Sequence, residues 1–191
     1  MPTSSRAETL ADHLAAARRD ARQLTSLPED LVPETVDEAY AVNSLVAQRL
    51  GWETLGWKIA GTTAAVRAKL RLGTPIYGRT FRRFACESPA HLRAGELLDP
   101  LVECEFFVTL ATGLPARPAP WTMPEVIEAV ATVYAGIEVA ECRFPSAALP
   151  PLPAILADGS ASGRYVFGDP IQRWRDGLAA VPVTLEPVRC R

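Results

Sequence analysis

The chain has 191 residues, a length typical of one domain, and its 48% apolar and 22% charged residues indicate a folded globular protein. A net charge of −2 argues against general nucleic-acid binding. No apolar run approaches the roughly 18 residues that cross a bilayer, and the first residues carry no secretory signal, so we expect a cytoplasmic protein without membrane or nucleic-acid partners.

The N-terminal part of the chain predicts two amphipathic helices. The first covers residues 5–24 and begins at a capping box, Ser5–Glu8. The second runs from another capping box, Thr35–Glu38, to Gly51, because glycine suits the left-handed end of a helix. The two helices form a predicted helical arm over residues 1–54.

The remainder, residues 55–191, predicts a β-rich body with few helices, so the predicted fold class is α+β, with arm and body forming one structural unit overall. Valine and phenylalanine dominate residues 101–110, the strongest predicted strand. The other predicted strands are 55–59, a long strand that follows Val133 and ends at Phe144, 164–167 and 181–188, with 77–84 a loop or a short strand. Helices are predicted over 63–70 and from Thr122 to about Val133, a loop over 145–153 and a tight turn over 158–163.

Two carboxylates lie side by side in the strongest predicted strand. Residues two apart in a strand point to the same face, so Glu103 and Glu105 share a face with Phe107. Neighbouring carboxylates on a largely apolar strand repel each other, and a hard divalent cation such as Mg²⁺ or Mn²⁺ would relieve that repulsion. The alternative is a sheet with one solvated face, on which paired glutamates need no ligand.

A further carboxylate lies in the next long strand. Glu138 stands between Ile137 and Val139 and points away from their face, whereas Glu141 shares it, so one of the two acids faces inward. Three carboxylates from two strands could supply half of an octahedral coordination shell. Alternatively, Glu141 is an ion-pair partner of Arg143, and Glu138 is a charge on an edge strand.

The chain contains only two lysines, Lys58 and Lys69, so a lysine-based mechanism has two candidates. Lys58 lies between Gly56 and Gly61 in an apolar segment, where glycine permits close approach of other backbone. A lysine in such a place can serve as a general acid or base. Alternatively, its ammonium group simply reaches water.

Other polar groups offer less specific signals. The predicted turn over residues 158–163 presents hydroxyl and backbone N–H groups that could bind a carboxylate, although such turns are common. Arg79, with Arg82 and Arg83, could hold an anionic substrate or form a solvated face. The four cysteines form no Cys-x-x-Cys pair and only two histidines occur, so we expect free thiols and no zinc site.

Five segments occur along the chain in a recognisable order: Gly56–Ile59, Thr74–Arg79, Pro100–Phe106, Gly136–Val139 and Ala157–Ser160. Together they resemble the 2-keto-4-pentenoate hydratase and 4-oxalocrotonate decarboxylase group of the fumarylacetoacetate hydrolase superfamily. The resemblance covers nearly the whole chain. Its most specific part is the Glu-x-Glu pair followed by a glutamate on a second strand.

The resemblance implies roles for particular residues. The implied ligands of Mg²⁺ or Mn²⁺ are Glu103, Glu105 and Glu138. The implied active-site lysine is Lys58. Substrate contacts are expected from Ser162, Ser160, Asp158 and Arg79. The implied fold is a mixed β-sandwich or roll, like the C-terminal domain of fumarylacetoacetate hydrolase, with the helical arm packed beside it.

The implied activity is metal-dependent hydration of a 2-hydroxy- or 2-oxo-dienoate, such as 2-hydroxypenta-2,4-dienoate, in the degradation of aromatic compounds. Decarboxylation of a 4-oxalocrotonate-type 2-oxo acid and C–C hydrolysis of an acylpyruvate stay open as alternatives. Neither histidine lies near a motif, which favours a lyase over a hydrolase. Some hydratases of the group carry an aspartate where this chain has Ile76.

The resemblance also implies an assembly. We expect a homo-oligomer that acts on a small 2-oxo acid, alone or in a complex with a related decarboxylase. Members of the group continue with further strands past the segment that matches residues 181–188, so we expect a body that is short at its C-terminus. A third class of function is therefore an inactive truncated homologue, or a subunit that supports an active one.

Overall fold

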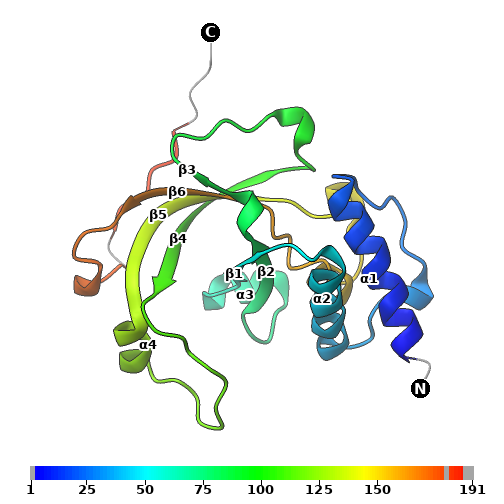
Figure 1. Cartoon of the computed structure of the whole chain (residues 1–191), viewed down its shortest axis with the longest axis horizontal. Helices are drawn as coiled ribbons and strands as arrows, with labels where there is room; N and C mark the ends of the chain where they lie inside the picture. Colours follow the sequence, from blue (N-terminus) through cyan, green and yellow to red (C-terminus); the bar gives the residue numbers. More distant parts are fainter. Residues whose placement is uncertain (1–2, 179–180, 187–191) are drawn as a thin grey trace. The chain divides into compact units, whose positions relative to one another are not determined.

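The computed structural model describes residues 3–178 and 181–186. Its helices are α1 (Thr3–Arg19), α2 (Val36–Leu50), α3 (Ala64–Leu70), α4 (Met123–Ala129) and α5 (Leu152–Ala157). Its strands are β1 (Thr54–Ala60), β2 (Ile76–Phe81), β3 (Ala85–Glu87), β4 (Leu101–Leu110), β5 (Val130–Ala140) and β6 (Arg164–Pro170), as Figure 1 shows. This mixture of helices and strands confirms the predicted α+β class.

The chain folds into two compact units whose segments alternate along the sequence. The first unit comprises the described residues up to Ala85, together with 91–101 and Val139–Arg164. The second comprises Cys86–Ala90, Val102–Glu138 and the described residues from Tyr165 onward. The division into an arm over residues 1–54 and a body over 55–191 stays a prediction.

Helices form one side of the core of the first unit. Helix α1 packs on α2, and α2 packs on α5 and β2 (Figure 1). Helix α2 has its predicted ends: the Thr35 hydroxyl accepts a hydrogen bond from the Glu38 N–H at 3.2 Å, and Gly51 has a left-handed φ of 61°. The Glu38 carboxylate accepts from the Glu34 N–H at 2.8 Å, so the predicted reciprocal bond to Thr35 is displaced by one residue.

Helix α1 differs from its prediction at both ends. It begins at Thr3, so Ser5 lies inside the helix and the predicted capping box at Ser5–Glu8 is wrong. It ends at Arg19, and Ala21 turns the chain with a φ of 47°. Leu24, which extends the apolar stripe of the helix, instead donates its N–H to the Arg143 carbonyl at 2.7 Å. A tertiary hydrogen bond thus replaces the last turn that periodicity predicted.

Strands β1 and β2 form a two-stranded antiparallel sheet in the first unit, with α3 between them in the chain. The predicted strand at 55–59 is confirmed as part of β1. The segment 77–84, predicted as a loop or a short strand, contributes most of β2. Lys58 lies opposite Gly78, and Trp57 lies opposite Arg79. Residues directly opposite each other share a face of the sheet, so Lys58 and Gly78 are on one face and the exposed Trp57 is on the other.

A buried ion-pair network lies within the first unit. The carboxylate of Asp158 is fully buried and accepts hydrogen bonds from the backbone N–H of Arg143 at 3.0 Å and from its Nε at 2.9 Å. The Nε of Arg18, from α1, lies 3.4 Å from the same carboxylate, and the Arg18 guanidinium also donates to the Asp158 carbonyl. The network therefore joins α1, the segment after β5 and the turn after α5.

Helix α5 was not predicted. It occupies part of the proline-rich segment 145–153, which predicted a loop. Pro151 precedes its first residue and Pro153 lies in its first turn, where the missing N–H and fixed φ of proline do not disturb a helix. Pro151 and Pro153 therefore mark the start of a helix, whereas the predicted loop is confirmed over residues 145–151, with one short 3-10 turn at Ser146–Ala148.

The second unit is built on a sheet with the strand order β3-β6-β5-β4. Strand β4 has its predicted bounds. Helix α4 begins at a capping box between Thr122 and Glu125, and it ends at Ala129 rather than near the predicted Val133. Val130, with Thr132 and Val133, begins β5 instead, because β-branched residues favour strands.

The end of the chain corrects another prediction. Residues 181–186 form no strand, so the strand expected over 181–188 is wrong for that part, and 187–188 lie outside the described residues. Proline at residues 182 and 187 brackets this short segment, and proline cannot donate to a strand ladder. Within 3–178 and 181–186, no helix combines the length and apolar character needed to cross a membrane.

We expect Asp158→Asn to destabilise the protein strongly. The variant leaves the buried guanidinium groups of Arg143 and Arg18 without a counter-charge, a change that costs about 3–5 kcal/mol. Urea unfolding followed by circular dichroism measures the loss. The matched control is Asp12→Asn, which breaks an ion pair with Arg49 of 2.7 Å between largely exposed side chains and should cost about 1 kcal/mol or less. Equal losses in the two variants would contradict a structural role for the network.

Candidate metal centre

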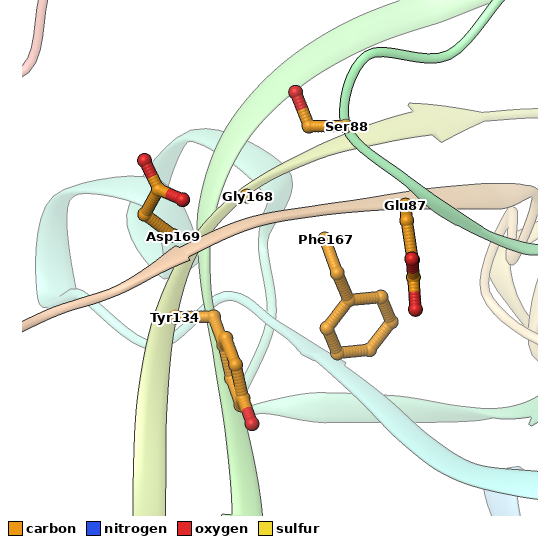
Figure 2. Close-up of a pocket in the computed structure, with 6 residues that line it drawn as sticks. All are labelled: Glu87, Ser88, Tyr134, Phe167, Gly168 and Asp169. Carbon is orange, nitrogen blue, oxygen red and sulfur yellow. The ribbon is translucent and has the colours of Figure 1, made fainter.

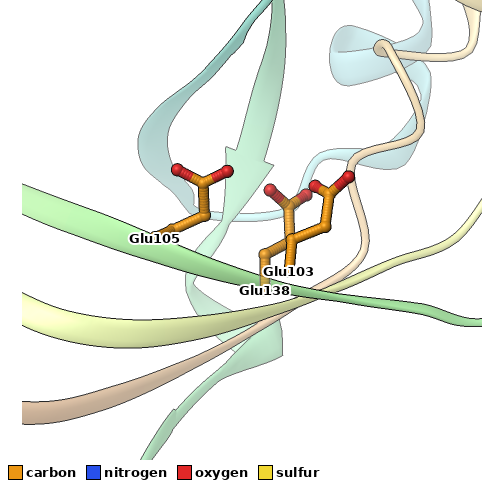
Figure 3. A group of neighbouring side chains, drawn as sticks. All are labelled: Glu103, Glu105 and Glu138. Carbon is orange, nitrogen blue, oxygen red and sulfur yellow. The ribbon is translucent and has the colours of Figure 1, made fainter. Parts of the chain in front are cut away.

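Three carboxylates converge on one face of the sheet of the second unit. Glu103 and Glu105 come from β4, and Glu138 comes from β5, its neighbour in the sheet. One oxygen from each carboxylate lies within 4.8 Å of the other two. Figure 3 shows the three side chains on the same side of the strands. Glu138 is buried, with 2% of its surface exposed, whereas Glu105 is exposed.

The alternation of β4 explains this arrangement. Glu103 and Glu105 point to the face that carries Glu138, and the residues between and beside them point the other way. That outer face is apolar and exposed at Val102 (47%) and Phe106 (39%). The period-two pattern in the sequence therefore assigns the carboxylates to one face correctly.

The donor set fits a hard divalent cation. It consists of carboxylate oxygens only, which Mg²⁺, Mn²⁺ and Ca²⁺ prefer over nitrogen or sulfur ligands. Like charges held this close repel one another, and a cation between them offsets the repulsion. Three protein ligands also suit Mg²⁺, which retains several water ligands.

Glu141 is not part of the carboxylate cluster. Its carboxylate accepts a hydrogen bond from the Leu98 N–H at 2.8 Å and lies 3.4 Å from the Nε of Arg164. The alternative in which Glu141 pairs with Arg143 is wrong, because the guanidinium of Arg143 pairs with Asp158. Of the two acids in this stretch of sequence, Glu138 joins the cluster and Glu141 has a structural ion pair.

Lys58 lies on the buried face of the β1–β2 sheet, with 9% of its surface exposed. Gly78 stands opposite it, and the carbonyl oxygen of Gly159 occupies the space beside Gly78. A Cβ at Gly78 would lie 1.9 Å from that oxygen, so glycine is required for the close approach. The side chain of Lys58 is thus enclosed rather than extended into water.

The polar turn at residues 158–163 is fastened to β2. The Ser160 hydroxyl donates to the Tyr77 carbonyl at 2.6 Å, and the Ser162 hydroxyl donates to the Arg79 carbonyl at 2.9 Å. Both serines are buried, as is Asp158. These bonds hold the turn against the strand that lies beside Lys58. Substrate contacts by Asp158, Ser160 and Ser162 stay a prediction.

The three arginines near Tyr77 have different neighbours. The guanidinium of Arg79 lies 4.0 Å from the centre of the Trp57 ring, and that of Arg83 lies 4.1 Å from the Trp52 ring. Arg82 pairs with Glu53 at 3.2 Å. These contacts define no common anion site, and substrate binding by Arg79 also stays a prediction.

A row of aromatic side chains continues the face that carries the carboxylates. Phe107 covers Gly136, at which a Cβ would lie 2.5 Å from the phenylalanine ring. The ring centre of Phe107 lies 4.7 Å from that of Phe167, which lies 5.8 Å from that of Tyr134. The period-two pattern of β4 places Phe107 on this face. The positions of Phe167 and Tyr134 beside it depend on how the strands pair, which the sequence does not reveal.

A cavity of about 480 Å³ adjoins this row (Figure 2). It is lined by Glu87, Ser88, Tyr134, Phe167, Gly168 and Asp169. Apart from the two rings, its side chains offer carboxylate and hydroxyl groups. All of these residues belong to the second unit, as do the three carboxylates of the metal centre.

Comparison with proteins of known name supports the predicted resemblance. The chain is 30% identical to 2-keto-4-pentenoate hydratase 1 of Dechloromonas aromatica over 164 residues, which cover 84% of this chain and 61% of that protein. It is 26% identical to a 4-oxalocrotonate decarboxylase of Pseudomonas putida over 181 residues, 93% of this chain and 67% of that protein. No family model matches.

Solved structures show a related fold. The 4-oxalocrotonate decarboxylase from Pseudomonas putida G7, complexed with magnesium and adipate, superposes with a TM-score of 0.76 at 24% identity, covering 86% of this chain and 63% of that one. The same enzyme has also been solved with calcium and acetate. The chain is thus homologous to the hydratase and decarboxylase group, as its motifs predicted, and spans about three fifths of the length of the first of these relatives.

We expect the cysteines to differ sharply in reactivity with iodoacetamide at pH 8. Burial raises the pKa of the Cys142 thiol to about 12, and the nearby charge of Asp158 adds to the shift, so almost no thiolate is present. Cys104 is exposed on the outer face of β4 and should be alkylated first. Peptide mass spectrometry over time measures both rates. Slow labelling of Cys104 would contradict the orientation of β4 that places Glu103 and Glu105 together, and fast labelling of Cys142 would contradict its burial.

Proposed function

We propose that this chain, as a homologue of the hydratase and decarboxylase group, is a divalent-metal-dependent lyase. Its substrate would be a small 2-hydroxy- or 2-oxo-dienoate such as 2-hydroxypenta-2,4-dienoate, to which it adds water. The observation that carries the proposal is the cluster of Glu103, Glu105 and Glu138, whose oxygens lie within 4.8 Å of one another. The related decarboxylase was solved with magnesium and with calcium, which supports a hard divalent cation as the cofactor.

In this proposal the three glutamates hold Mg²⁺ or Mn²⁺ and leave other coordination positions to water and substrate. The bound ion would act as a Lewis acid, stabilising negative charge on the C1 carboxylate and C2 oxygen of the substrate. Glu138 gives the site a fixed, buried ligand, whereas the exposed Glu105 leaves one side of the cluster open to solvent.

We assign proton transfer to Lys58. In ketonisation the C2 hydroxyl loses its proton and C5 gains one, giving a 2-oxo-3-enoate. Water then adds its hydroxyl to C4 and a proton to C3, giving a 4-hydroxy-2-oxo acid. An enclosed lysine suits such proton transfer because it is shielded from exchange with bulk water.

Decarboxylation is the second candidate, and the matches to 4-oxalocrotonate decarboxylases favour it specifically. In that reaction the bond from C5 to its carboxylate breaks, CO₂ leaves, and the electron pair passes through the conjugated system to the C2 oxygen. The same three glutamates would serve. Loss of the absorbance of 2-hydroxypenta-2,4-dienoate would indicate hydration, and release of CO₂ from 4-oxalocrotonate would indicate decarboxylation.

Assembly as a homo-oligomer, association with a related decarboxylase and a cytoplasmic location belong to the same proposal. The remaining alternative is an inactive homologue or a supporting subunit. Light scattering of the purified chain, alone and mixed with a related decarboxylase, separates self-association from a dependence on the partner.

We expect the chain to bind one Mg²⁺ or Mn²⁺ in isothermal titration calorimetry. The double variant Glu103→Gln/Glu105→Gln should lose detectable binding, because amides replace two of the three charged ligands. Glu128→Gln, at an exposed glutamate of α4 in the same unit, is the matched control and should bind as the wild type does. A folded wild type that binds neither ion would refute metal dependence and favour the supporting-subunit alternative.

We expect Lys58→Ala to lower kcat by about 100-fold or more while the affinity for Mg²⁺ stays near that of the wild type. Lys69→Ala is the matched control, since Lys69 is the other lysine and is exposed. Steady-state hydration of 2-hydroxypenta-2,4-dienoate gives kcat, and calorimetry gives the metal affinity. Unchanged turnover in Lys58→Ala would remove this residue from the mechanism.

A further inference from the structure

The carboxylate cluster and the aromatic row lie on one continuous face of one sheet. Phe107 follows Glu105 by two residues on β4, about 7 Å along the strand, and shares its face. On β5, Gly136 precedes Glu138 by two residues, and Phe107 covers it. A molecule held at the carboxylates therefore has an aromatic surface beside it, within the second unit.

Neighbouring residues of the sheet fix the position of the Phe107 ring. The absence of a side chain at Gly136 leaves the space that the ring occupies, because even a methyl group there would lie 2.5 Å from it. The neighbouring ring of Tyr165 is buried, with 4% of its surface exposed, and its centre lies 5.9 Å from that of Phe107. Phe107 itself is partly exposed.

We propose that Phe107, together with Phe167 and Tyr134, forms the surface on which the tail of the 2-oxo acid rests, and that this surface selects substrates with a flat, uncharged tail. This inference rests on the proposed function, since it needs the substrate's C1 and C2 oxygens at the carboxylate cluster. Conjugated carbon chains are planar and pack well against aromatic faces.

A tail that ends in a carboxylate is disfavoured on this surface for two reasons. A charged group loses hydration when it lies against the faces of aromatic rings. Beyond Phe167, the carboxylate of Glu87 lines the adjoining cavity on the same side as the ring and repels the charged end of the tail (Figure 2). The structure of the second unit thus points to a monocarboxylic 2-oxo acid, and so to hydration rather than decarboxylation of a dicarboxylate.

The test uses three unreactive probes with Mg²⁺ present: oxalate, which has no tail, 2-oxopentanoate, which has an uncharged tail, and 2-oxoglutarate, which has the same carbon count and a charged end. Calorimetry on the wild type should show 2-oxopentanoate binding about ten-fold or more tighter than 2-oxoglutarate. This comparison needs no variant. Equal affinities, or tighter binding of 2-oxoglutarate, would overturn the inference.

Phe107→Ala should weaken 2-oxopentanoate binding about ten-fold and leave the affinities for Mg²⁺ and oxalate unchanged. Gly136→Ala, which displaces the ring without removing it, should act in the same direction. Phe106→Ala is the matched control, because Phe106 is the neighbouring phenylalanine of β4 on the opposite, outer face. An effect on oxalate as large as that on 2-oxopentanoate would show a general structural role and overturn the inference.

The two proposals fail in different ways. A wild type that binds neither Mg²⁺ nor oxalate refutes the proposed function, and this inference with it. A wild type that binds both, but whose affinity for 2-oxopentanoate is unchanged in Phe107→Ala and Gly136→Ala, refutes this inference alone.

Discussion

Mutual repulsion among three closely spaced carboxylates is the constraint around which the second unit is organised. Side chains that repel one another must be held by a rigid backbone, and adjacent strands of a sheet provide it. Strand β4 contributes Glu103 and Glu105, and β5 brings Glu138 alongside them. The same face leaves Gly136 without a side chain, so that Phe107 can lie beside the cluster. An ionic site and an apolar surface thus share one scaffold.

The first unit contains a buried carboxylate, that of Asp158, whose charge must be compensated. Asp158 is fully buried, and a buried carboxylate is tolerated only with charge partners and hydrogen bonds, which Arg143 and Arg18 supply. Because Arg18 belongs to α1, the N-terminal helix is tied to the turn after α5. That turn in turn bonds to β2, the partner strand of Lys58, so the helices contribute to the surroundings of this lysine.

Elements with strong local signals were predicted accurately from the sequence. Helix α2 has side-chain and glycine caps at its ends, and β4 is a long run of β-formers between Pro100 and Gly113, so each has its expected bounds. The predictions failed where a tertiary contact competes with a local pattern. Helix α1 ends before its predicted last turn, and the N–H of Leu24 bonds to the carbonyl of Arg143 instead. Helix α5 was not predicted because the prolines at its start indicated a loop.

The sequence by itself determined which residues share a face. The two-residue spacing of Glu103 and Glu105 follows from strand geometry alone, and so does the position of Phe107 beside them. Strand geometry left open whether Glu138 or Glu141 faces inward, and the family resemblance favoured Glu138. Only the tertiary structure places Glu138 beside the pair and pairs Glu141 with Arg164. The physical reason is that backbone periodicity acts over a few residues, whereas the pairing of strands and charges joins residues that are far apart in the chain.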